Sequence, residues 1–130
     1  MYLRFVVAQV DKGSGRELGV FQAAYNLRDA GKLYPYEKPQ LDELRQWFDT
    51  HLQEPTRFTA SKPPYYRKKS SAISWFKDSA REHVARVREI VAILENHGVR
   101  VRMIKADRVG YVVYEDEHQV VAEPFTDMHC

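Results

Sequence analysis

The stretch SAREHVARVREIVAILENHG, from Ser79 to Gly98, begins the segment that organises the fold of this chain, which runs on to Phe125. Its apolar residues recur at intervals of three and four, which places them on one face of a helix. The charged residues between them fall largely on the opposite face, as in a helix that packs against a core. Gly98 predicts the helix end, because glycine adopts the left-handed terminating conformation without a Cβ penalty. The stripe predicted to enter the core is Ala80, Val84, Val87, Ile90, Val91 and Leu94.

Two starting points fit this helix. Ser79 is followed three residues later by Glu82, which is the spacing of a capping box. Alternatively, the helix begins near Ser71, since Ile73 and Phe76 extend the apolar stripe backwards.

Three segments with strand character follow the helix. Residues 99–103 alternate apolar and cationic side chains, 110–114 are aromatic and β-branched, and 119–122 are again mostly apolar. Turn-forming residues at 107–110 and 115–118 separate them. Because short turns join antiparallel neighbours, the pattern predicts a three-stranded antiparallel meander.

The N-terminal half predicts one strand and two further helices. Residues 1–10 are almost continuously apolar apart from Arg4 and Gln9, which is typical of a central strand buried on both faces. Residues 19–30 predict a helix that Gly31 ends, and a second helix runs from about Pro39 to Pro55.

These elements predict the α+β class: an N-terminal strand, three helices and the meander, with the helices packed on one face of the sheet. The length of 130 residues fits a single domain, 1–130. The one cysteine, Cys130, excludes a disulfide framework and a cysteine-based metal site. The short apolar run at the N-terminus does not fit a signal peptide, and no stretch has membrane-spanning length, so we expect a cytoplasmic protein.

Charge is segregated along the chain. Residues 57–108 carry 13 basic and 5 acidic side chains, whereas 109–130 carry 5 acids and neither Lys nor Arg. In one interpretation the basic segment faces a polyanion. In the other, favoured as the ordinary behaviour of charged faces, the acidic end folds back on the basic helix and neutralises it.

A basic, irregular stretch is the strongest candidate binding site. Residues 55–72 predict a long loop, and 126–130 predict a frayed tail. Cations there and on the strand 99–103 could bind phosphates, while aromatic rings could stack on bases. No recognised nucleic-acid-binding motif accompanies them, so an ordinary solvated loop is the competing interpretation. The candidate binding residues are Lys62, Tyr65, Tyr66, Arg67, Lys68, Lys69, Trp75, Arg100 and Arg102.

The histidines predict no definite chemistry. His83 lies beside Val84 on the helix and could act as a general base, but without a partner a boundary histidine is the simpler interpretation. His118 lies among acids near the C-terminus, with His129 and Cys130 beyond, but the spacing matches no established metal-ligand pattern. The sequence therefore predicts neither a metal site nor a cofactor.

Two segments, WFKDSA at 75–80 and GYVVYEDEHQVVAEPF at 110–125, resemble a family of small bacterial proteins with no assigned function. The resemblance implies a bacterial cytoplasmic protein and supplies no catalytic residues. The predicted order of elements is also similar to that of RelE-type endoribonuclease toxins, as an analogy of topology alone.

Two functional hypotheses follow. The first is a non-catalytic binding or regulatory module for a protein or a polyanion, including nucleic acid. The alternative is a metal-independent endoribonuclease acting on RNA, with residues 65–69 facing the substrate and His83 as the base.

Overall fold

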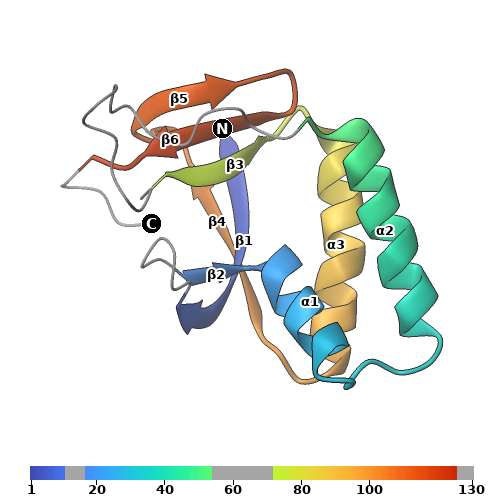
Figure 1. Cartoon of the computed structure of the whole chain (residues 1–130). Coiled ribbons are helices and arrows are strands. Elements are labelled where there is room, and N and C mark those ends of the chain that lie inside the picture. The colour runs from blue at the N-terminus through green and yellow to red at the C-terminus, as the bar shows by residue number, and fades with distance from the viewer. Residues whose placement is uncertain (11–16, 54–71, 126–130) are drawn as a thin grey trace, which may run out of the picture.

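The computed structural model describes residues 1–10, 17–53 and 72–125, and it shows an α+β fold with three helices on one side of a six-stranded antiparallel sheet (Figure 1). The predicted class is therefore confirmed. In chain order the elements are β1 (Tyr2–Val10), β2 (Glu17–Gly19), α1 (Val20–Asp29), α2 (Glu37–His51), β3 (Ile73–Lys77), α3 (Arg81–Asn96), β4 (Val101–Ala106), β5 (Tyr111–Glu115) and β6 (Gln119–Glu123).

β1 is the central strand of the sheet, as predicted. β4 pairs with one edge of β1 from Tyr2 to Val7. The other edge is shared, because β2 pairs with β1 from Val6 onward while β3 pairs with Tyr2 and Leu3. Leu3, Phe5, Val6 and Val7 are all buried, which is the burial on both faces that a continuous apolar run predicts.

The predicted meander is wrong in its first strand. β4 pairs with β1, over six residue pairs from Tyr2–Ala106 to Val7–Val101, and not with β5. β5 and β6 do form an antiparallel hairpin, and β6 also pairs with β3. The turn chemistry at 107–110 shows only that the chain bends. In this pairing Val101 and Met103 pack against the helix-side core.

α3 begins at Arg81 with Ala80 as its N-cap, one residue after the N-cap position that the capping-box pattern gives to Ser79. The alternative start near Ser71 is wrong, because Ile73–Lys77 is a strand that pairs with β6. Ile73 is buried and Ser74 is exposed, which is the alternation of a strand. The apolar residues of this segment also fit a helix, so the alternation was not evident from the sequence.

The predicted end of α3 is confirmed. Gly98 has φ +75°, and its N–H donates to Glu95 O while that of Val99 donates to Leu94 O. These two bonds form a Schellman motif.

The core consists of two clusters on opposite faces of the sheet. The helix-side cluster joins Leu3 and Phe5 of β1 to the helices, and it includes Val87, Ile90 and Leu94 of the predicted α3 stripe. The back cluster consists of Ile73, Trp75, Val109, Val120 and Ala122.

Some predictions lie outside the described residues. These are the basic loop 55–72, except Ala72, and the tail 126–130. Within the described ranges, no helix combines the length and apolar character needed to cross a bilayer.

Candidate functional site

The shared edge of β1 produces a notch in the sheet. β3 pairs with β1 at Tyr2 and Leu3, and β2 pairs with it from Val6. Arg4 and Phe5 of β1 lie between these two pairings. A cavity of about 380 Å³, here called the notch pocket, lies at this position. Its volume falls within the range of roughly 300–1,000 Å³ that is typical of small-molecule sites.

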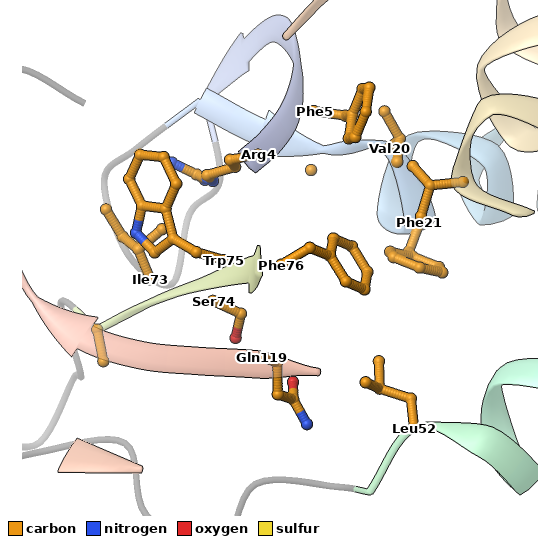
Figure 2. A pocket seen from close by; sticks show the side chains of 13 residues that line it. Arg4, Phe5, Val20, Phe21, Leu52, Ile73, Ser74, Trp75, Phe76 and Gln119 are labelled. Carbon is orange, nitrogen blue, oxygen red and sulfur yellow. The ribbon is translucent and has the colours of Figure 1, made fainter. Parts of the chain in front are cut away.

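The notch pocket has an apolar end on the helix side of the sheet. Phe21 and Phe76 approach each other there, with ring centroids 6.5 Å apart, and Val87 of α3 is fully buried behind them. In Figure 2, Phe76 projects toward Phe21 from one side of β3. The lining residues at this end are Phe5, Val20, Phe21, Leu52, Phe76 and Val87.

The other end of the notch pocket holds donor groups. Figure 2 shows Arg4, Ile73 and Trp75 gathered on the opposite side of β3 from Phe76. Trp75 is only 2% exposed, and its Nε1 is buried with no hydrogen-bond partner among the described residues. An indole N–H can only donate, and leaving such a group buried and unbonded costs about 1–3 kcal/mol.

A second, polar pocket of about 320 Å³ adjoins the notch pocket through Leu52. Its other lining residues are Asp49, Thr50, His51, Gln53, Asp116, Glu117 and His118. The ring of His118 stacks on that of His83, with centroids 4.1 Å apart. No group of three or more His, Cys, Asp or Glu side chains within the described ranges is arranged to hold a metal ion.

Asp116 supports the turn between β5 and β6. Its carboxylate accepts bonds from the hydroxyl of Tyr114, from both nitrogens of Gln119 and from the backbone N–H of His118, all within 3.1 Å. Burial alone would raise the pKa of Asp116, but these hydrogen bonds outweigh it and the pKa lies below its ordinary value. Asp116 is therefore an anion that shapes the polar pocket.

His83 is buried, at 5% exposure, and not at a boundary as the sequence predicts. Its Nε2 lies 2.8 Å from the backbone oxygen of His51. Because a carbonyl oxygen only accepts, Nε2 must carry the proton and donate it to this bond. His83 Nε2 cannot then serve as the general base that the RNA-cleavage hypothesis assigns to it.

The predicted binding residues do not form one site among the described residues. Lys62 and residues 65–69 lie outside the described residues. Trp75 forms part of the notch-pocket wall, where its burial leaves no exposed ring face for a base at the surface. Arg100, just before β4, and Arg102, within it, are exposed and are not among the described residues that line the notch pocket.

Sequence reasoning missed most of the notch pocket. Arg4 carried a signal, because a cation interrupts an otherwise apolar strand. Phe21 and Gln119 carried none, since a single phenylalanine or glutamine in an amphipathic segment is ordinary. They line one pocket only because β2 and β3 share one edge of β1.

No protein-family model, curated protein or solved structure matches this chain. The resemblance to a bacterial family, the analogy with RelE-type toxins and the cytoplasmic location therefore stay predictions.

Proposed function

We propose that this protein is a non-catalytic binding module whose ligand occupies the notch pocket. The supporting observation is the buried Trp75 N–H, which has no partner among the described residues and lies in the wall of a cavity. Buried donors in proteins are nearly always bonded. A buried donor that lacks a partner at a cavity wall points to an acceptor supplied by a ligand.

The composition of the lining favours binding over catalysis. Arg4 is the one ionisable side chain among the described lining residues, and the remainder are apolar, aromatic or neutral. A guanidinium stays protonated at all accessible pH values, so it orients an anion but exchanges no proton near neutrality.

A steric block tests the proposal. Gly19 lines the notch pocket, has an extended backbone with φ −72°, and has open space where a Cβ would stand. Gly19→Leu should fill part of the cavity and weaken binding of the amphipathic dye anilinonaphthalene sulfonate by at least about ten-fold, measured by dye fluorescence. Gln22→Leu, an exposed change in the first turn of α1, which follows Gly19 directly, is the matched control and should leave dye binding unchanged.

Trp75 supplies a second measurement. The chain has two tryptophans, so Trp47→Phe leaves Trp75 as the only one. Dye binding should then quench Trp75 emission. Equal dye affinity in the Gly19→Leu and Gln22→Leu variants, or Trp75 emission that does not respond to the dye, would refute the proposal.

RNA cleavage is the competing function, and the His118–His83 stack beside the polar pocket is the feature that bears on it. Asp49, Asp116 and Glu117 line the same pocket, and their charges would repel a phosphate. We therefore expect no cleavage of mixed RNA in the presence of EDTA. If the wild type cleaves RNA and His118→Asn abolishes that cleavage, the binding proposal is wrong and the protein is an endoribonuclease.

A further inference from the structure

We infer that the outer edge of β4 is a docking site for an extended, acidic peptide segment of a partner protein, which joins the sheet as a further strand. This surface is separate from the notch pocket, because no residue of β4 is among the described residues that line that cavity. The inference therefore goes beyond the proposed function. It follows from the backbone, the charges and the apolar side chains of this one strand.

The backbone of β4 presents a template for strand addition. Val101–Ala106 pairs with β1 along its whole length and with no other strand among the described residues (Figure 1). An edge strand directs a row of N–H and C=O groups away from its sheet, where another extended chain can bond to them. Peptides that bind in this way gain affinity from main-chain hydrogen bonds. The six residues of β4 include neither proline nor glycine, so the template is continuous.

Charge selects an acidic partner. Arg100, Arg102 and Lys105 are exposed, and residues 100–106 include no acid, although Asp107 follows in the bend after the strand. Cations on an edge strand ordinarily discourage pairing, because a neutral or basic strand does not offset their charge. An acidic strand does offset it, since opposite charges that face each other across two strands stabilise the pair.

Apolar side chains lie between these cations. Val101, Met103 and Ile104 are only half-buried, so an added strand would cover more of their surface. Arg102 and Lys105 are three residues apart and therefore lie on opposite faces of the sheet. The complementary segment has two acids three positions apart, with apolar or β-branched residues between them.

Two other occupants are disfavoured. Every charged side chain of β4 is basic, so β4 of a second copy would bring cations against cations. Single-stranded nucleic acid gains affinity from exposed rings on which its bases stack. The strongly exposed aromatic residues of the described chain, Tyr34, Tyr36 and Tyr111, all lie outside β4.

Fluorescence anisotropy of the full chain with labelled eight-residue peptides tests the inference. The peptide TVEVVEVT places its two glutamates so that they face Lys105 and Arg102 in an antiparallel pair, and TVKVVKVT is its basic counterpart. At low salt the acidic peptide should bind at least about ten-fold more tightly, since each exposed ion pair contributes up to about five-fold. Its affinity should fall as added salt screens these charges.

Two N-methylated peptides separate strand addition from simple charge attraction. Both have the sequence TVEVVEVT, and methyl groups block the main-chain amides at the odd positions of one and at the even positions of the other. Because alternate residues of a strand bond to the same neighbour, only one of the two peptides should lose binding. The unmethylated peptide should also slow solvent exchange of β4 amides.

A charge reversal assigns the contact to β4. Lys105→Glu should weaken binding of TVEVVEVT at least about five-fold, and the peptide TVKVVEVT should restore it, because its lysine faces residue 105 in an antiparallel pair. Lys38→Glu, an exposed change on α2, alters the net charge equally and is the matched control. It should leave the affinity within about two-fold of wild type.

The following results would overturn the inference. One is a failure of the acidic peptide to bind, or equal binding of the acidic and basic peptides. Another is binding that neither N-methylated peptide loses, which would reduce the interaction to charge alone. A third is labelled single-stranded RNA that binds more tightly than TVEVVEVT and is weakened by Lys105→Glu, which would make β4 a nucleic-acid surface. The wild-type series decides even where a variant fails to fold.

Discussion

Glu37 is the most deeply buried acid among the described residues, at 1% exposure. It accepts bonds from the backbone N–H of Tyr34 at 2.8 Å and the amide of Asn96 at 3.0 Å, and it lies 2.6 Å from His97 Nε2. One side chain thus joins the start of α2 to the end of α3. Burial alone would raise the pKa of Glu37, but the hydrogen bonds outweigh it and the pKa is lowered.

The lowered pKa of Glu37 makes stability depend on pH. Its ordinary value is 4.5, so the folded state binds the proton less readily than the unfolded state. The stabilisation is complete above that value and is lost as pH falls through the lower, folded pKa. Glu37→Gln should reduce the free energy of unfolding at neutral pH by about 1–3 kcal/mol in urea denaturation.

Acid conditions should narrow the gap between wild type and Glu37→Gln, because both then carry a neutral side chain. Glu43→Gln, exposed on the same helix, is the control and should stay within about 0.5 kcal/mol of wild type. A gap that is the same in acid and at neutral pH would show that the charge of Glu37 does not contribute.

Among the elements, the β5–β6 hairpin depends on Gly110. Its φ is +114°, and a Cβ there would overlap the backbone carbonyl of Glu123 on the partner strand. Gly110→Ala should therefore cost more than about 2 kcal/mol through strain and overlap together. Gly19→Ala, at an extended backbone position with open space, is the matched control and should change the melting temperature little.

Substitutions in α3 test whether its apolar stripe belongs to the core. Val87 is fully buried, whereas Ala85 is exposed two residues away on the same helix. Val87→Asp should lower the free energy of unfolding by more than about 3 kcal/mol, since it buries an unpaired carboxylate. Ala85→Asp introduces the same side chain into water and should cost under about 1 kcal/mol. Similar losses in chemical denaturation would place the stripe at the surface.

At the scale of the whole molecule, β1 joins three other strands into one sheet. Its amides should exchange with solvent more slowly than those of β4 and β5, which each pair with one strand only among the described residues, because the centre of a sheet opens only with global unfolding. Nuclear Overhauser contacts between the Cα protons of facing β1 and β4 residues, such as Phe5 and Met103, would verify this pairing. Contacts between β4 and β5 instead would contradict the β1–β4 pairing and support the predicted meander.

The charge segregation has a partial structural counterpart. Lys77 of the basic segment lies 2.6 Å from Glu115 of the acidic segment, so the two segments do meet. The pair joins strands β3 and β5, whereas the sequence interpretation placed the contact on the basic helix.

Local sequence patterns predicted the structural features that depend on residues close together along the chain. The 3–4 spacing of Val87, Ile90 and Leu94 and the terminating Gly98 identified α3, because helix periodicity and helix ends involve residues within one or two turns. The same reasoning failed at Ile73–Lys77, where a short apolar segment next to a helix fits either structure.

The sequence by itself determined the class, the central strand and the stripe that α3 buries, since each follows from the order of apolar and polar residues. Only the tertiary structure decided that β4 pairs with β1, that β2 and β3 share one edge, and that Arg4 and Trp75 line one cavity. Strand pairing joins residues separated by about a hundred positions, and its free energy comes from the shared core. No local spacing encodes that choice, so the candidate site appears only when the sheet is assembled.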